Sequence, residues 1–241
     1  MNNKILVSFA SRRFENAQKN LVESAKTHGI TGYVSYTEDN IPVEFITKNL
    51  EIWKNPRGFG YWCWKPYIIL KTLMELDDGD MVIYVDSCNL VVSDLSIIFD
   101  ECNKSEIVLF DNRDGNYSGD SWKNLRWTKR DCFRLMNCDT SKYWNGDQIN
   151  ASYQVYKKTD KSIKFLNEYI NFCENKNIIS DDPNITFENF DEFEDHRHDQ
   201  SIASLLAIKY DISLMIDPSE WGNSNINRTY PQLFWHCRGR L

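Results

Sequence analysis

The fold class is decided by the stretch Asp78-Gly-Asp-Met-Val-Ile-Tyr-Val-Asp-Ser-Cys88. Its centre, Met81 to Val85, has almost no polar content. An apolar run without alternation is typical of a strand in a parallel sheet that is covered on both faces. The run ends at Asp86, and open α/β sheets bind their ligands beyond the carboxyl ends of the strands. The stretch therefore predicts a buried central strand and a binding site at its end.

Elements around this strand alternate between strand and helix. The apolar run at 4–9 predicts a strand, and apolar residues at helical spacing from Phe14 to Ala25 predict a helix that Gly29 closes. A strand at 33–37 completes a β-α-β unit, which implies a parallel sheet. The further predictions are a helix from Pro66, a helix at 93–102, a strand at 106–110, a helix to Met136 opened by a Thr128–Asp131 capping box, an antiparallel strand at 151–157, a helix at 160–176 and a last helix at 202–210. We expect an α/β fold with a mostly parallel central sheet flanked by helices.

The length predicts one compact unit. A chain of 241 residues is within the range of a single domain and buries a substantial core. No internal repeat or low-complexity linker divides it. We therefore expect one domain over residues 1–241, in which a boundary near residue 140 separates two subregions.

The net charge and the aromatic content limit the classes of ligand that we expect the protein to bind. The formal net charge of -7 argues against nucleic acid as a partner, because nonspecific binding needs many Lys and Arg contacts to phosphate. The 8 Trp, 12 Tyr and 13 Phe are an unusually large aromatic share, and their flat rings suit both a core and the stacking of sugars or bases. This composition hints at a carbohydrate ligand.

Cysteine usage and the amino terminus bear on the compartment. The seven cysteines are odd in number and never spaced as Cys-x-x-Cys, so neither a zinc knuckle nor a disulfide framework is indicated. The first apolar run is too short for a signal peptide, and no stretch approaches the roughly 20 apolar residues of a transmembrane segment. We expect a soluble, cytoplasmic protein and leave open a peripheral contact with a membrane.

Four motifs in order carry a resemblance to a known family. They are Arg57-Gly-Phe-Gly-Tyr-Trp-Cys-Trp-Lys-Pro66, Tyr84-Val-Asp-Ser-Cys88, Gln148-Ile-Asn-Ala-Ser152 and His196-Arg-His-Asp-Gln-Ser201. From Lys4 to Arg240 the chain resembles bacterial and viral sugar transferases related to capsular-polysaccharide and Och1-like GT-A glycosyltransferases. The resemblance implies hexosyl transfer from a nucleoside-diphosphate sugar, UDP- or GDP-linked, to a glycan or glycoconjugate acceptor in polysaccharide biosynthesis. Residues 1–140 would then bind the nucleotide, and residues 141–241 the sugar and the acceptor.

The resemblance also implies a divalent cation, Mn²⁺ or Mg²⁺. The GT-A signature is Asp-x-Asp, and this chain has Asp86-Ser87-Cys88 in its place, so a thiol replaces the second carboxylate. Mn²⁺ and Mg²⁺ prefer oxygen ligands to a soft thiol, which makes the departure significant. The predicted metal ligands are Asp86, Cys88 and, as the late histidine of related enzymes, His236. Asn89 or a water is the alternative to Cys88, and a carboxylate that caps the turn after the strand is the alternative for Asp86.

Two stretches are predicted to contact the donor, the first as a lid over it or as a cradle for its diphosphate, and the second at its phosphates. In the Arg57–Lys65 stretch, glycines permit close backbone approach, Trp62 and Trp64 offer ring faces, and Lys65 precedes a helix amino terminus that can host an anion. The alternative is an aromatic plug of the core. Near the carboxyl end, Arg238 and Arg240 are predicted to clamp phosphate oxygens, and a basic tail without an ordered role is the alternative.

The remaining donor contacts are predicted near the first strand and in two later motifs. Ser11, Arg12 and Arg13 follow the first strand, where a nucleotide would lie, and an ordinary polar loop is the alternative. Asn150-Ala-Ser152 resembles the Asn-Ala-Gly stretch that contacts the donor sugar in many GT-A enzymes, and a plain edge strand is the alternative. The predicted contacts with the donor in this part of the chain are Ser87, Gln148, Asn150, Ser152, His198 and Gln200.

Two carboxylates are predicted to be catalytic, Asp199 and Asp147. If the His198-Asp199-Gln200 loop faces the sugar, Asp199 would bind hydroxyls or act as the base for the acceptor hydroxyl. The alternative for Asp199 is a helix cap. His196 and His198 share a strand spacing, but two histidines without a third ligand are a weak indication of zinc.

Three functions are compatible with these sequence features. A glycosyltransferase is favoured by Asp86 at the strand end and by the charged carboxyl-terminal stretch. A non-catalytic carbohydrate-binding module would use the tryptophans as stacking platforms but has no need of diphosphate ligands. A nucleotidyltransferase would also bind a nucleotide, and the glycine-rich phosphate loop expected of it is absent from the sequence.

Overall fold

The central sheet has five strands in the order β2-β1-β3-β6-β5. A computed structural model describes residues 2–112 and 121–237. β1 (Lys4–Ala10) pairs in parallel with β2 (Gly32–Thr37) and with β3 (Met81–Val85). β6 (Ile149–Lys157) runs antiparallel to β3 and to β5 (Ile107–Asp111), so the other four strands share one direction. The predicted α/β fold with a mostly parallel sheet is confirmed.

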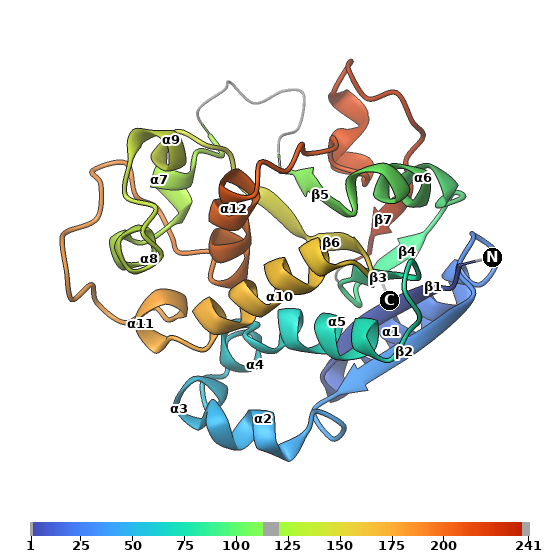
Figure 1. Cartoon of the computed structure of the whole chain (residues 1–241), viewed down its shortest axis with the longest axis horizontal. Coiled ribbons are helices and arrows are strands. Elements are labelled where there is room, and N and C mark those ends of the chain that lie inside the picture. Colours follow the sequence, from blue (N-terminus) through green and yellow to red (C-terminus); the bar gives the residue numbers. More distant parts are fainter. Residues whose placement is uncertain (1, 113–120, 238–241) are drawn as a thin grey trace.

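Helices cover both faces of this sheet (Figure 1). One face packs against α1 (Glu15–Ala25) and α6 (Ser96–Ser105). The other packs against α5 (Trp64–Met74), α10 (Asp160–Cys173) and α12 (Asp199–Lys209). Because side chains alternate along a strand, Val82 and Tyr84 of β3 face the second layer, whereas Ile83 faces the first. All five residues of β3 are buried, as the apolar run predicted.

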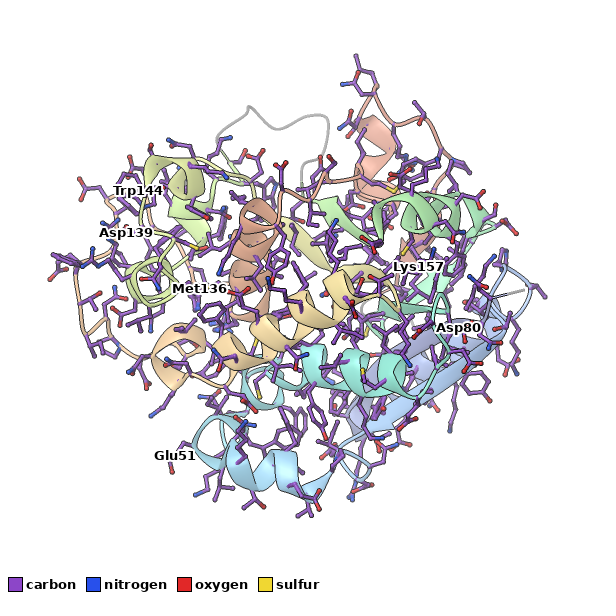
Figure 2. All side chains as sticks on the ribbon, viewed as in Figure 1. Glu51, Asp80, Met136, Asp139, Trp144 and Lys157 are labelled. Atoms are coloured by element: carbon purple, nitrogen blue, oxygen red, sulfur yellow. The ribbon has the colours of Figure 1, made fainter. Side chains whose placement is uncertain are left out.

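Shorter elements surround the two layers. A lobe beyond α12 holds α7 (Asn124–Trp127), α8 (Arg130–Leu135), α9 (Ser141–Trp144) and α11 (Lys176–Ile179). Figure 2 labels Asp139 and Trp144 in this lobe, where the indole Nε1 donates a hydrogen bond to the carboxylate (2.9 Å). Two helices, α2 (Val43–Lys48) and α3 (Leu50–Trp53), precede a single irregular turn, α4 (Gly58–Tyr61).

A second, two-stranded sheet joins the middle of the chain to its carboxyl end. β4 (Asn89–Val91) pairs antiparallel with β7 (Phe234–His236). Two 3₁₀ helices complete the described elements, η1 (Arg12–Phe14) and η2 (Glu220–Ser224). The small sheet brings residues that are 147 positions apart, Asn89 and His236, directly opposite each other.

Some predicted boundaries and one predicted cap are wrong. The helix predicted from Pro66 begins earlier, at Trp64, and the helix predicted to 176 ends at Cys173. The capping box at Thr128 does not form. Its hydroxyl accepts a hydrogen bond from Gln148, and the Asp131 carboxylate accepts the backbone N–H groups of residues 185 and 186 instead. Among the described residues, no helix combines the length and the apolarity needed to cross a bilayer.

Candidate active site

A pocket of about 420 Å³ lies at the carboxyl ends of β1 and β3. Six of its lining residues are aromatic, namely Phe9, Phe14, Phe59, Trp62, Trp64 and Tyr84. Six are polar, namely Ser11, Asp86, Ser87, Cys88, Ser152 and His236. A pocket with apolar walls and a few polar groups is typical of a site for a small organic ligand. Its position matches the ligand-binding edge predicted from the strand that ends at Asp86.

Asp86 is the only carboxylate among the described residues that line the pocket, and none of those lining residues is Lys or Arg. Its backbone N–H donates to the carbonyl of Ser152 (3.0 Å), and its own carbonyl accepts from Asn89 Nδ2 (2.9 Å). Its side chain accepts a hydrogen bond from the Tyr84 hydroxyl at Oδ1 (2.6 Å). Within the described chain the carboxylate accepts no hydrogen bond from a backbone amide, so it does not cap the turn.

Tyr84 holds Asp86 from within the strand. The two residues are two positions apart, so their side chains share one face of the sheet. Burial first, and then the neighbouring carboxylate, raise the pKa of Tyr84 well above its ordinary value. The hydroxyl therefore keeps its proton and remains a donor to Asp86.

Lys65 lies behind the pocket rather than in its wall. Its side chain is 3% exposed, and its Nζ is 2.8 Å from Asp199 Oδ2, 3.7 Å from Asp86 Oδ1 and 3.2 Å from the carbonyl of Ala151. Burial lowers the pKa of Lys65, but the two carboxylates outweigh it and leave the pKa raised, so the ammonium stays charged. Its charge is therefore turned toward the two carboxylates, and its predicted place in a diphosphate cradle stays a prediction.

Asp199 is the inward partner of Lys65. Its carboxylate also accepts from the hydroxyl of Tyr169 (3.3 Å), and burial raises the pKa of Asp199 against the opposing effect of Lys65. The side chain bonds to no backbone amide among the described residues, so the helix-cap alternative is wrong. Asp199 does not line the pocket. Its role as a base stays a prediction.

The segment from Gly58 to Trp62 forms a left-handed turn. Five consecutive residues have positive φ: 59° at Gly58, 52° at Phe59, 84° at Gly60, 56° at Tyr61 and 60° at Trp62. For residues other than glycine this conformation costs roughly 1–2 kcal/mol each, and such strain is concentrated at ligand sites. The turn places the rings of Phe59 and Trp62 in the pocket wall.

The same stretch also supplies core residues. The Trp64 ring stacks on Phe9 with centroids 4.0 Å apart, and its Nε1 donates to the carbonyl of Gly58 (3.0 Å). Tyr61 is buried and stacks on His198 at 4.7 Å. The two interpretations of this stretch, a donor-facing loop and an aromatic core plug, thus each describe some of its rings.

The three predicted metal ligands line one pocket. The pairing of β4 with β7 carries His236 to it, and the backbone N–H of Cys237 donates to the carbonyl of Cys88 (3.0 Å). In residues 2–112 and 121–237, no three His, Cys, Asp or Glu side chains are arranged closely enough to hold an ion as they stand. Arg238 and Arg240 lie outside the described residues.

Several predicted donor contacts are not part of this pocket. Gln148 is buried and donates to Asn124 Oδ1 (2.8 Å), and Gln200 donates to Gln148 (3.2 Å). Asn150 donates to Asp217 Oδ2 (2.7 Å), so its amide is engaged in the scaffold. Hydrogen bonds inside the protein take up the amides of these three residues, and their predicted contacts with the donor stay predictions.

Charged candidates also lie elsewhere. Asp147, the other predicted catalytic carboxylate, forms an ion pair with Lys123 (2.8 Å). Arg12 and Arg13 are exposed and do not line the pocket, and Arg12 is 3.7 Å from Asp39. His198 is buried, and its Nδ1 is 2.8 Å from the carbonyl of Ile179. Of the predicted site residues, the structure brings together Ser11, Trp62, Trp64, Asp86, Ser87, Cys88, Ser152 and His236.

Sequence reasoning missed four aromatic lining residues. Tyr84 could have been found, because it precedes Asp86 by two positions on one strand. Phe9 lies near the end of the first strand and Phe14 follows that strand, and both were interpreted only as core residues. Phe59 carries no such signal, because its direction depends on the left-handed turn.

Comparison with known proteins identifies the fold. No protein-family model matches the chain, and no curated protein sequence does. Among solved structures, the WbbM bifunctional glycosyltransferase in its apo form aligns with 99% of this chain and 46% of its own, at a TM-score of 0.55 and 12% identity. Mouse xyloside xylosyltransferase 1 in its apo form aligns with 98% of this chain and 97% of its own, at 0.50 and 7%.

These similarities are similarities of fold. The chain spans less than half the length of the WbbM protein. At 12% and 7% identity, the shared feature is the α/β architecture, which confirms the predicted GT-A-like fold class. The fold of this chain is therefore one that glycosyltransferases of known structure also have.

Proposed function

We propose that this protein is a glycosyltransferase that moves a hexose from a UDP- or GDP-linked donor to a hydroxyl of a glycan or glycoconjugate. One observation carries the proposal: the pocket at the ends of β1 and β3 joins six aromatic rings to the carboxylate of Asp86. The rings suit the flat base and the apolar face of a sugar. The likeness in fold to two glycosyltransferases supports the same conclusion.

Charge balance favours a divalent cation in this pocket. A diphosphate bound there would face the Asp86 carboxylate, with no Lys or Arg from the described lining residues to offset the repulsion. Mn²⁺ or Mg²⁺ between Asp86 and the diphosphate would remove it. Asp86 and His236 fit such an ion better than Cys88, whose sulfur is soft. When bound, the ion would stabilise the charge that builds on the leaving diphosphate.

The protein's own groups would orient the donor. The hydroxyls of Ser11, Ser87 and Ser152 line the pocket and can donate to or accept from ribose and sugar hydroxyls. We extend the proposal to Arg238 and Arg240 as phosphate ligands. A base role for Asp199 or Asp147 requires the acceptor hydroxyl to reach a carboxylate that is ion-paired with a lysine in this structure.

The test uses a panel of UDP, GDP, CDP and their sugars, with and without Mn²⁺. The melting temperature of the protein and its turnover are measured with each compound. A nucleotide that binds only the folded state raises the melting temperature, and we expect that rise to depend on Mn²⁺. Replacing Asp86→Asn should abolish the Mn²⁺-dependent rise and lower kcat by about 100-fold, the scale typical of losing one electrostatic group of a site.

The matched control is Asp39→Asn, which makes the same change at an exposed carboxylate outside the pocket. It should leave both the shift and the turnover as in the unmodified protein. If sugars bind while no nucleotide does, the protein is a carbohydrate-binding module. Full turnover in Asp86→Asn would remove Asp86 from the mechanism.

A further inference from the structure

A fully buried lysine stands between the pocket carboxylate and an interior one. Lysine side chains are almost never fully buried unless they are paired. The ammonium of Lys65 has three donors and three oxygen neighbours. They come from α12, from the residue after β3 and from β6: Asp199 at 2.8 Å, Asp86 at 3.7 Å and the carbonyl of Ala151 at 3.2 Å. Its position is thus fixed from three directions.

Both groups that reach Asp86 from behind act on one oxygen. The Tyr84 hydroxyl donates to Oδ1, and Lys65 Nζ lies nearest to the same Oδ1. Within the described chain, Oδ2 accepts no hydrogen bond. The Asp86 side chain is 36% exposed, whereas that of Lys65 is 3% exposed. One oxygen is therefore held by the protein, and the other remains available to a ligand in the pocket.

Asp199 is in turn held in place. Tyr169 of α10 donates to its carbonyl (3.1 Å) and lies 3.3 Å from its Oδ2. Because α10 and α12 pack in the same core, the line Tyr169–Asp199–Lys65–Asp86 connects the interior of the second layer to the pocket. A lysine that only neutralised Asp199 would not need to approach Asp86 as well.

We propose that Lys65 is a positioning residue that orients Asp86 through Oδ1, and that Asp199 holds Lys65 in place. The inference rests on the proposed function for its consequence, which is affinity for a metal-bound nucleotide. Supporting groups behind a metal ligand typically change metal affinity by about 10–100-fold when removed. The competing explanation is that Lys65 serves only as the counter-ion of Asp199.

The experiment compares Lys65→Met, Asp199→Asn and the double variant. Lys65→Met leaves a buried carboxylate without its partner and should be destabilised. Adding Asp199→Asn removes that carboxylate charge, so the double variant should recover stability in urea denaturation. If Lys65 positions Asp86, the double variant should remain weakened in binding although it is folded. Titration calorimetry with Mn²⁺ and UDP or GDP should then give an affinity about tenfold below that of the unmodified protein.

Two controls separate positioning from structure. Asp199→Asn alone keeps an oxygen acceptor for Lys65 but removes the charge that holds it, so its nucleotide affinity should lie between those of the unmodified protein and the double variant. Lys71→Met removes a partly exposed lysine of the same helix, paired with Glu75, and should change neither stability nor binding strongly. Unmodified affinity in the folded double variant would show that Lys65 only neutralises Asp199.

A crystal structure of the double variant supplies a readout that does not depend on any nucleotide. Loss of the Tyr84–Asp86 hydrogen bond, with a rotated Asp86 carboxylate, is the expected result. An unchanged Asp86 would overturn the positioning role even if nucleotide binding is robust. Absence of nucleotide binding in the unmodified protein would instead overturn the proposed function.

Discussion

Titratable residues in this protein differ sharply in their access to water. The Asp86 side chain is 36% exposed in the pocket, whereas those of Asp199 and Lys65 are 4% and 3% exposed behind it. Burial penalises the charged form of each buried group, and the pairing of Lys65 with Asp199 and Asp86 opposes that cost. The pocket carboxylate and the two residues behind it thus differ in their depth below the surface.

Buried histidine makes stability dependent on pH. Burial lowers the pKa of His198 from 6.5 to about 4, although Asp181 lies 3.6 Å away, and burial lowers the pKa of His196 as well. Below pH 6.5 the unfolded chain therefore binds protons at these histidines that the folded chain does not bind. We expect the contribution of neutral His198 to the free energy of unfolding to be fully present above pH 6.5. It should be lost between pH 6.5 and about 4, by on the order of 3 kcal/mol.

Urea denaturation at pH 7 and at pH 4.5 measures this change. His198→Asn suits the positive φ of 52° at this position and removes the imidazole, so its free energy of unfolding should fall less steeply with pH. An equally steep decline in that variant would assign the dependence to other groups.

Single residues show where prediction from sequence succeeds. The position of Asp86 at the pocket could be predicted because a buried strand and its end are local features of the sequence. The inward direction of Lys65 could not, because it depends on Asp199, which is 134 positions away. The engaged amides of Gln148 and Asn150 were missed for the same reason, since their partners come from distant segments.

At the scale of elements, the strained turn over residues 58–62 is the departure from regular structure that shapes the pocket. It persists because its glycines meet close neighbours: a Cβ on Gly60 would lie 2.9 Å from Trp53 Cα and 3.0 Å from the carbonyl oxygen of Ile52. Hydrogen bonds from Gly60 N to the Asn55 carbonyl and from Tyr61 N to the Arg57 carbonyl close the turn. The surroundings thus hold a conformation that the aromatic residues alone would avoid.

Gly60→Ala tests this account of the turn. At φ 84° an alanine is strained, and its methyl group would contact backbone atoms that cannot move aside cheaply. We expect a loss of about 2–4 kcal/mol in the free energy of unfolding, measured in urea. Gly32→Ala is the matched control, because its φ is ordinary and its Cβ would meet only the flexible end of Ile5; it should cost less than about 1 kcal/mol. Equal costs at the two sites would contradict the role assigned to the turn.

Element types followed the sequence closely, whereas turns and caps did not. Apolar periods predicted β1, α1, β3, β6 and α10 within a few residues. The left-handed turn and the lost cap at Thr128 depend on distant contacts, such as the hydrogen bonds of Asp131 to the 185–186 backbone. Local propensity yields to tertiary contacts at these points.

At the scale of the whole molecule, the sheet order joins the two predicted subregions. β6 belongs to the part after residue 140, yet it lies between β3 and β5 of the part before it. This order could not be predicted from local patterns, because strand pairing is decided by contacts between distant segments. Its consequence is that neither subregion contains a complete sheet.

We therefore expect the chain to unfold as one cooperative unit. Without β6, β3 and β5 would lose their shared neighbour and expose unpaired edges, and the buried faces of α10 and α12 would be missing from the second layer. Circular dichroism and tryptophan fluorescence should report coincident urea transitions, since tryptophans occur in both parts. A fragment of residues 1–140 should lack a cooperative transition. Two separate transitions in the full chain, or a stably folded fragment, would show that the boundary near residue 140 divides independent domains.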